Sequence, residues 1–395
     1  MSNVNFLEKL LNDVDVEWKA LKDLTLPTRN IKWREANRSY RYIDLTSVNI
    51  ETKAVTETIE VTSADAPSRA QKLVEKNDVI FATTRPTQKR YCLIEDNYSG
   101  EIASTGYCVL RAKQNVIMPK WILHWIASSD FNKYVEENQS GSAYPAISDA
   151  KVKEFKIPIP CPGKPKKSLE IQTEIVRILD TMTSHTAELT AELTAELTLR
   201  QKQYNYYRDK LLSFEDGEVE WKTLEKITHS IASGRNKIRS DIGEYKVYGS
   251  TGLIGYSDKY EYSEDVLLVA RVGAYAGLVN AASGKFDVSD NTLIVKPTNE
   301  WNIRFAFHQL TNMNINKYAV GAGQPLVTAG MLKSLKVPFP PLAEQVRISN
   351  ILDKFDTLTA SIVEGIPREI ELRQKQYEYY RDALLSFPKS NAVSE

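Results

Sequence analysis

One segment of this chain is present twice. The sixteen residues LRQKQYNYYRDKLLSF at 199–214 return as LRQKQYEYYRDALLSF at 372–387, and only two positions differ. At the same offset of 173 residues (372 minus 199), Ile178-Leu179-Asp180 becomes Ile351-Leu352-Asp353. The repeated unit therefore covers about 169–214 and 342–387, and both copies are expected to form the same local structure.

Two longer segments, about 15–160 and 218–340, precede the copies and show no comparable similarity to each other. They nevertheless begin and end alike. Val16-Glu-Trp-Lys19 returns as Val219-Glu-Trp-Lys222, and Ala143–Ser148 aligns with Gly323–Thr328. Duplication followed by drift could simply have enlarged the protein, but drift would not spare the shared segments while erasing the others. We interpret the order as variable, shared, variable, shared, with different contents in two equivalent positions.

Each shared segment is predicted to be one long amphipathic helix, because apolar residues recur at spacings of three to four with Gln, Glu, Arg and Lys between them. At ~1.5 Å per residue the helix from 169 to 213 would reach roughly 65 Å, more than one small domain needs, so the second copy is its expected partner. Direct connections favour antiparallel packing, with the two variable domains related by a pseudo-two-fold axis in a circular arrangement. The expected spacer positions are Leu189, Leu193, Leu197, Ile362, Ile366 and Ile370.

The two predicted helices differ at one place each. Thr186–Leu197 consists of three copies of Thr-Ala-Glu-Leu, all good helix formers apart from Thr, and we interpret this run as an adjustable spacer. An accident of replication is the alternative origin, although four residues add just over one turn and so keep the apolar face approximately. In the second copy Gly365 and Pro367 are expected to kink or break the helix.

Proline-bearing runs at 157–162 and 337–341 are incompatible with helix and mark the ends of the variable domains. Strand-like runs within each variable segment predict a mixed α/β domain, and the expected fold class is α+β. The predicted organisation is a first domain at 1–162, a spacer helix at 163–216, a second domain at 217–341, a spacer helix at 342–388 and a tail at 389–395.

Composition excludes several classes of protein. The 51 Lys and Arg residues equal the 51 Asp and Glu residues, which argues mildly against binding nucleic acid by bulk charge. The first residues lack the pattern of a signal peptide, and the expected location is the cytoplasm. Three widely spaced cysteines indicate neither a disulfide framework nor a zinc site, and we expect them to be packing residues: Cys92, Cys108 and Cys161.

Motifs of catalysis are absent from the sequence. It contains no phosphate-binding loop of the G-x-x-x-x-G-K-[ST] type, no G-x-G-x-x-G fingerprint and no Asn-Pro-Pro-aromatic run of the kind that adenine methyltransferases use. The histidines match no metal-ligand spacing and are expected to be structural: His124, His185, His229 and His308. We expect no catalytic residue and no metal in this chain.

Basic residues cluster beside turn-forming and small polar residues in both variable segments. Arg and Lys pair with phosphate or guanine, while Asn and Gln pair with adenine, so such loops suit contact with nucleic acid. For any single cluster a solvated loop is the alternative. The candidate DNA contacts are Arg34, Arg38, Arg41, Thr84, Arg85, Thr87, Lys89, Arg90, Tyr144, Arg235, Asn236, Lys237, Arg239, Ser250, Thr251, Arg271 and Gln324.

The layout and three runs resemble the specificity subunit of type I restriction-modification systems over about residues 1–388. The runs are Pro338–Gln345 leading into Ile351-Leu352-Asp353, Tyr248–Tyr256 and Ala82–Thr87. The Thr-Ala-Glu-Leu copies and the near-identical helix ends resemble the type IC subgroup. One departure is that Pro-Pro-Leu-Ala-Glu-Gln of the second copy becomes a longer Pro160–Gln172 in the first, so the partner-binding surfaces are expected to be unequal.

The resemblance implies two target recognition domains that each read one half of a split, asymmetric site in double-stranded DNA, with the helices setting the gap. It also implies two modification subunits, docked on the helices, that carry S-adenosylmethionine and methylate adenine, and through them two restriction subunits that use ATP and magnesium. No cofactor is implied for this chain, and no membrane. The alternatives are a coiled-coil scaffold that binds only proteins and a fused methyltransferase, for which the chain lacks a cofactor domain.

Overall fold

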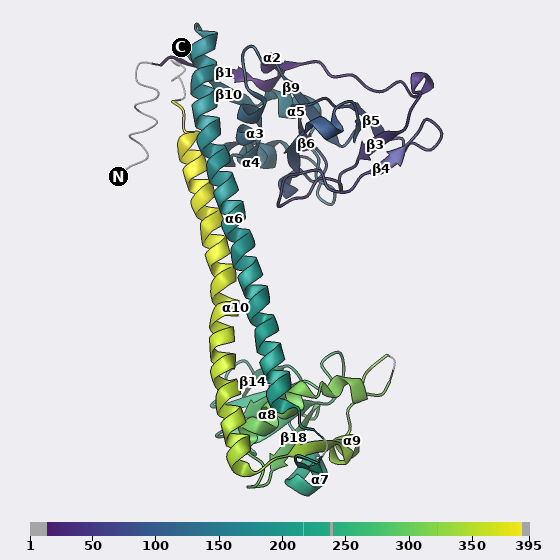
Figure 1. Ribbon diagram of the computed structural model, residues 1–395, viewed down its shortest axis with the longest axis vertical. Coiled ribbons are helices and arrows are strands. Elements are labelled where there is room, and N and C mark those ends of the chain that lie inside the picture. Colours follow the sequence, from purple (N-terminus) through teal and green to yellow (C-terminus); the bar gives the residue numbers. More distant parts are fainter. Residues whose placement is uncertain (1–13, 216, 238–239, 322, 389–395) are drawn as a thin grey trace. The chain divides into compact units, whose positions relative to one another are not determined.

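The computed structural model describes residues 14–215, 217–237, 240–321 and 323–388. The chain divides into two units, and Figure 1 labels several of their helices and strands. Unit 1 joins the chain up to Leu193 to the segment that begins at Arg368, and unit 2 is Thr194–Pro367. Each unit contains one variable domain and parts of both long helices.

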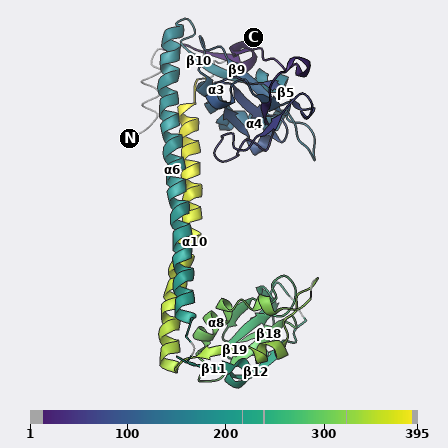
Figure 2. The same ribbon diagram turned by 45° about the vertical axis from the view of Figure 1, so that its right-hand side comes forward.

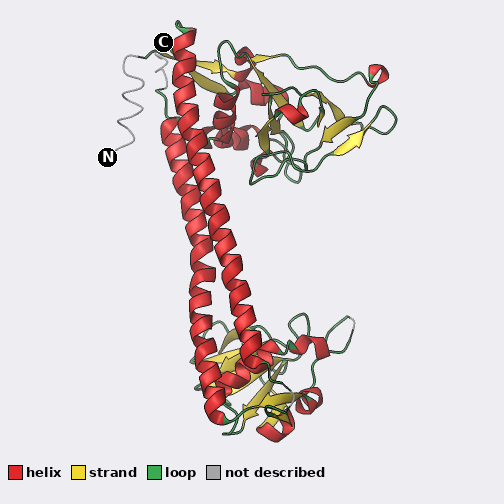
Figure 3. Ribbon diagram, viewed as in Figure 1, coloured by secondary structure: helices red, strands yellow, loops and turns green. Residues whose placement is uncertain are grey.

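The domain of unit 1 is built from short strands in three sheets, shown in yellow in Figure 3. The four-stranded sheet that forms most of its core has the order β2-β9-β6-β7, a second has the order β4-β3-β8-β5, and β1 pairs with β10. The strands are β1 Val16–Ala20, β2 Thr25–Leu26, β3 Tyr40–Ile43, β4 Ile59–Val61, β5 Ala70–Leu73, β6 Val79–Ala82, β7 Tyr91–Leu93, β8 Ile102–Ser104, β9 Tyr107–Ala112 and β10 Lys156–Pro160.

Helices cover one face of this sheet. All four residues of β6 are buried, as expected for a strand with side chains packed on both faces. On one face lie the buried Trp121 and Trp125 of α3, with Phe131 of α4 beside them. The helical segments are α2 Leu21–Leu24, α3 Pro119–Ala127, α4 Ser129–Asn138 and α5 Asp149–Glu154, with 3-10 turns at Trp33–Glu35, Pro86–Gln88 and Asp96–Tyr98.

The domain of unit 2 repeats this plan with different loops. Its sheets have the orders β12-β18-β15-β16 and β14-β13-β17, and β11 pairs with β19. The parallel pair β13 and β17 matches the parallel pair β3 and β8 of unit 1. The elements are β11 Glu220–Thr223, α7 Leu224–Ile227, β12 Thr228–Ser233, β13 Tyr245–Gly249, β14 Gly252–Ser257, β15 Val266–Ala270, β16 Val279–Ala282, β17 Phe286–Val288, β18 Thr292–Pro297, α8 Ile303–Asn312, a 3-10 turn Ile315–Tyr318, α9 Ala329–Ser334 and β19 Lys336–Phe339.

The similar beginnings and ends of the two variable segments have a structural explanation. In unit 1, Trp18 lies opposite Pro158 in the antiparallel pair of β1 and β10, and in unit 2, Trp221 lies opposite Pro338 in the pair of β11 and β19. Proline lacks an amide hydrogen, but it is tolerated in a two-stranded ribbon, where each strand has a free edge. The first and last strands of each domain therefore close it before the long helix begins.

The long helices are α6, Pro165–Leu212, with 48 residues, and α10, Leu342–Leu384, with 43 residues. Within each unit, segments of α6 and α10 lie side by side and antiparallel, as Figures 1 and 2 show. The six predicted spacer positions, Leu189 to Leu197 and Ile362 to Ile370, are all half-buried. Among the helices that the structure describes, none has the apolar length that a bilayer crossing requires.

Each domain core receives side chains from the start of one long helix and the end of the other. In unit 1 these are Ile175 of α6 and Leu384 of α10, followed by Phe387, and in unit 2 they are Leu352 of α10 and Leu212 of α6. The predicted circular arrangement is therefore present in the packing of both cores.

The prediction of a break at Pro367 is wrong, because α10 continues through it from Leu342 to Leu384. Proline removes one backbone hydrogen bond, at a cost of about 3 kcal/mol inside a helix. The apolar residues of α10 before and after Pro367 are packed in the two cores, among them Leu352 and Leu384, and this packing holds both halves helical.

Candidate nucleic-acid interface

A glutamine on each long helix holds the adjoining domain. Gln172 of α6 accepts a hydrogen bond from the backbone amide of Met118 (2.9 Å) and donates to the carbonyl of Val116 (3.1 Å). In unit 2, Gln345 of α10 accepts one from the backbone amide of Asn302 (2.8 Å). Met118 and Asn302 precede the first residues of α3 and α8, where backbone amides lack helical acceptors, so each glutamine satisfies a group that the helix cannot.

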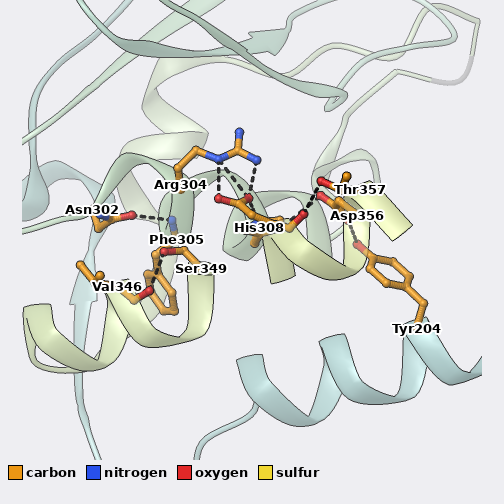
Figure 4. A network of polar contacts seen from close by, with 10 residues as sticks. Tyr204, Asn302, Arg304, Phe305, His308, Val346, Ser349, Asp356 and Thr357 are labelled. Atoms are coloured by element: carbon orange, nitrogen blue, oxygen red, sulfur yellow. Dashed lines mark hydrogen bonds and ion pairs between the residues drawn. The ribbon is translucent and has the colours of Figure 1, made fainter. Parts of the chain in front are cut away.

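In unit 2 a carboxylate on α10 extends this attachment, and Figure 4 shows the surrounding network. Asp353 accepts hydrogen bonds from Arg304 (2.5 Å) and His308 (2.8 Å) of α8, and Asp356 accepts one from the hydroxyl of Tyr204 on α6 (2.5 Å). Burial would raise the pKa of Asp353, but the bonds from Arg304 and His308 outweigh it and hold the pKa below its usual value.

Unit 1 has the same arrangement at equivalent positions. Asp180 of α6 contacts Lys120 (2.6 Å) and His124 (2.9 Å) of α3. The hydroxyl of Tyr377 on α10 contacts that of Thr183 on α6 (2.9 Å). Both histidines, His124 and His308, are buried and hydrogen-bonded to an aspartate, which agrees with the structural role predicted for them, and duplication explains why the two attachments match.

One group of side chains in unit 2 has the composition of a metal site. The ligand atoms of His308, Asp353 and Asp356 all lie within 4.8 Å of one another. Arg304 already donates a hydrogen bond to Asp353, and Tyr204 already donates one to Asp356. A cation would have to displace both hydrogen bonds and the guanidinium charge, so the arrangement favours an attachment of domain to helix rather than a metal centre.

Away from the helices, two loops of the first domain bring four of the candidate contacts together. Thr84 pairs with Ala146 in a β-bridge, and the amide of Arg85 donates to the carbonyl of Pro145 (2.7 Å). The guanidinium of Arg85 lies 5.2 Å from the centre of the Tyr144 ring, and Tyr144 is 71 % exposed. Thr87, in the 3-10 turn that follows, is also exposed. An exposed cation beside an exposed aromatic ring suits contact with both phosphate and base.

Other candidates in the first domain differ in whether a carboxylate neutralises them. Arg38 lies 3.3 Å and Arg41 3.8 Å from the buried carboxylate of Glu101, so much of their charge is already compensated within the domain. Arg34 is exposed in the 3-10 turn Trp33–Glu35. Lys89 is exposed, and Arg90 donates from Nη1 to the carbonyl of Val48 (2.6 Å).

Second-domain candidates converge on the segment 288–291, between β17 and β18. The carbonyl of Asn291 accepts from the amide of Arg271 (2.9 Å) and from the hydroxyl of Ser250 (3.0 Å). The amides of Arg235 and Asn236 donate to Val288 (3.0 and 2.9 Å). The side chain of Asn236 donates to Asp287.

The remaining second-domain candidates lie on exposed loops. Lys237, Thr251 and Gln324 are exposed. Gln324 occupies the position of Tyr144, because the amide of Gly273 donates to Pro325 (3.0 Å) as that of Arg85 does to Pro145. Equivalent loops therefore carry different side chains in the two domains. Arg239 lies outside the described residues.

The cysteines agree with the packing role predicted for them. All three are free and buried, and burial raises the pKa of the Cys92 and Cys108 thiols to about 12, which leaves them protonated and unreactive at neutral pH.

Sequence reasoning missed the groups that attach the domains to the helices, and it missed Lys53. Gln172 and Gln345 occupy equivalent positions of the two shared segments, and Asp180 and Asp353 lie within the aligned triplets, so identity between the copies could have indicated a common role. No sequence pattern distinguishes Lys53 from the other lysines of the chain.

Comparisons with known proteins connect this architecture to one family. The type I restriction modification DNA specificity domain matches residues 14–199 and 218–372. The Escherichia coli type I restriction enzyme EcoR124I/EcoR124II specificity subunit is 36 % identical over the full length of both chains. The Escherichia coli EcoprrI specificity subunit is 35 % identical over 92 % of this chain and 93 % of its own. These matches support the DNA specificity role and give no support to a scaffold that binds only proteins.

Two solved structures share the fold. A chain from a study of complex assembly and conformational transition of the type I restriction-modification system has a TM-score of 0.77 at 21 % identity, over 94 % of this chain and 97 % of that one. The HsdS subunit from Thermoanaerobacter tengcongensis has a TM-score of 0.60 at 21 % identity, over 94 % and 96 %. With duplicated helices, two domains of one plan and matches across both of them, this chain belongs to the family of type I restriction-modification DNA specificity subunits.

Proposed function

We propose that each domain of this specificity subunit reads one half of a bipartite, asymmetric site in double-stranded DNA. One observation carries the proposal: the two domains share the order of their main sheet and their helix attachments but differ in loop side chains, with Arg85 and Tyr144 in one and Gly273 and Gln324 at the equivalent positions of the other. A common frame with different base-contacting side chains reads two different sequences.

The long helices set the distance between the two half-sites. α6 is a single helix whose first turns pack in the first core and whose last residue, Leu212, packs in the second. The Thr-Ala-Glu-Leu copies lie between these attachments, at 186–197. Removing four helical residues shortens α6 by ~6 Å, which corresponds to at most about two base pairs at ~3.4 Å each.

Two modification subunits dock on the helices. Leu199 and Tyr206 of α6 are 59 % and 60 % exposed, and their counterparts in the repeat, Leu372 and Tyr379 of α10, are 52 % and 70 % exposed. Large apolar side chains exposed at equivalent positions favour one protein-binding surface on each helix. We expect Tyr206→Ala and Tyr379→Ala each to lose one modification subunit, as counted by native mass spectrometry of the complex.

This chain is the non-catalytic subunit of its complex and acts in the cytoplasm, where its DNA substrate lies. S-adenosylmethionine belongs to the modification subunits, and ATP and magnesium belong to two restriction subunits that join through them. The three Thr-Ala-Glu-Leu copies support assignment to the type IC subgroup.

Genome-wide mapping of methylated adenines tests the proposal in cells that carry this chain with its modification subunit. The comparison is with a variant that lacks Thr190–Leu193. We expect a bipartite motif whose gap shortens by one or two base pairs while both halves stay unchanged. The absence of any motif would refute two-domain reading, and an unchanged gap would refute only the role of the helix in spacing.

A further inference from the structure

A lysine in the first domain lies in a tightly closed loop. The loop is closed by backbone hydrogen bonds from Thr56 to Ser47 (2.8 Å) and from Asn49 to Ala54 (3.0 Å). The side-chain oxygen of Asn49 accepts from two further amides of the loop, at 2.8 and 2.9 Å. Lys53 therefore has a well-defined position before any ligand arrives.

A second loop places two more cations beside Lys53. The ammonium of Lys53 donates to the carbonyl of Lys89 (2.6 Å) and lies 4.5 Å from the centre of the Tyr91 ring. Arg90 is fixed by its bond to the carbonyl of Val48, in the first loop. The two hydrogen-bonded loops thus bring the charges of Lys89 and Arg90 close enough to act on that of Lys53.

None of these three cations forms an ion pair within the described part of the chain. No carboxylate there lies within 4.0 Å of Lys53, Lys89 or Arg90, whereas Arg38 is paired with Glu101. Burial, Lys89 and Arg90 together lower the pKa of Lys53 to about 8. Like charges held together without a carboxylate destabilise the free protein, and an anion would relieve that repulsion.

Backbone strain is concentrated at the same place. Lys53, Arg85 and Lys89 have φ angles of 53°, 49° and 54°, in the left-handed region that residues other than glycine rarely adopt. Strain of this kind persists where the surrounding structure enforces it, and it accumulates at ligand sites. Three of the six such residues recorded in the described chain are basic and belong to these two loops.

We propose that Lys53, Lys89 and Arg90 form a binding site for one backbone phosphate of DNA. The inference rests on the proposed function, because the neighbouring Arg85 and Tyr144 are the candidate contacts of the same domain. Phosphate suits the site because it accepts several charge-assisted hydrogen bonds at once. The site adds affinity and fixes the orientation of the domain on DNA without reading sequence.

The test uses the complete chain with its modification subunits and a duplex that carries the motif found by methylation mapping. Affinity is measured by fluorescence anisotropy at several salt concentrations. We expect Lys53→Gln to weaken binding about tenfold, to reduce the slope of log affinity against log salt by about one, and to leave the motif unchanged. Lys53→Arg should retain most of the affinity. When single phosphates are replaced with neutral methylphosphonates, one position should lower the affinity of the wild type for the duplex and leave that of Lys53→Gln unchanged.

Lys76→Gln is the matched control, since Lys76 is an exposed lysine of the same domain that is already paired with Asp96 at 2.9 Å. An equal loss in Lys76→Gln, or wild-type affinity and salt slope in Lys53→Gln, would overturn the phosphate site. Thermal unfolding of both variants shows whether a loss of DNA affinity comes from a lost contact or from a domain that no longer folds. A wild-type complex that does not prefer its own motif over a shuffled duplex would instead refute the proposed function, and the phosphate site with it.

Discussion

Replacing Gln345 with alanine should loosen the second domain from α10. Gln345 is completely buried, and its amide makes three hydrogen bonds. It accepts from the amide of Asn302 (2.8 Å) and donates to the carbonyls of Glu300 (3.0 Å) and Pro340 (2.8 Å). Alanine leaves all three backbone groups without this partner in a place that water reaches poorly.

The expected loss of stability in unit 2 is about 3–5 kcal/mol. A buried polar group left without a partner costs about 1–3 kcal/mol, and three are affected, although a carbonyl can relax toward other donors. A loss of this size is a large fraction of the stability of a domain.

Native-state hydrogen exchange provides the measurement, because the amides of α8 report on unit 2 separately from unit 1. We expect their exchange to accelerate by at least a hundredfold in Gln345→Ala. The control is Gln201→Ala, at an exposed position of α6, which should change stability by less than about 0.5 kcal/mol. A loss below about 1 kcal/mol for Gln345→Ala would refute the argument from its hydrogen bonds. Gln172→Ala should have the same effect on α3 in unit 1.

Two further predictions concern pH. The pKa of Lys53 is lowered to about 8, and Lys89, Arg90 and Tyr91 face its ammonium group. Because a bound phosphate would raise this pKa, DNA binding takes up a proton above pH ~8. The affinity of the wild type for DNA should therefore fall between about pH 7 and pH 9, and that of Lys53→Arg should change less. The folded-state pKa of Asp353 is held below its unfolded value of ~3.9, so its contribution to stability is present above that pH and is lost as pH falls through the folded pKa. The stability of the wild type, measured by urea unfolding, should therefore fall more steeply than that of Asp353→Asn as pH drops below about 4, and equal slopes would contradict this.

Several features of the fold follow from sequence because they depend on local periodicity. The apolar spacing along α6 and the near-identity of the two copies required two long helices of the same kind, and antiparallel packing followed from the short connections. The same local rules predicted an interruption of the helix at Pro367. That prediction was wrong because the packing of α10 in both cores outweighs one lost hydrogen bond.

The candidate site could be predicted only in part. Basic residues in polar loops were visible in the sequence, but their partners were not, because those partners are distant along the chain. Glu101 neutralises Arg38 from 63 residues away. Lys53 contacts Lys89 from 36 residues away, and no carboxylate of the described residues pairs with it. Charge in a sequence is a property of single residues, while the availability of that charge depends on which neighbours the fold supplies.

The amino-acid sequence by itself determined the repeat, the helices and the order of the domains, since each is set by residues close together in the chain. Tertiary structure decided which of the predicted contacts remain open to a ligand and how each domain is attached to its helix. Gln345 and Asp353 illustrate the difference: both are conspicuous in the repeat, but only the packing of α8 against α10 gives them partners and a role. Hydrogen bonds and ion pairs between distant segments form only after the chain has folded, and periodicity cannot encode them.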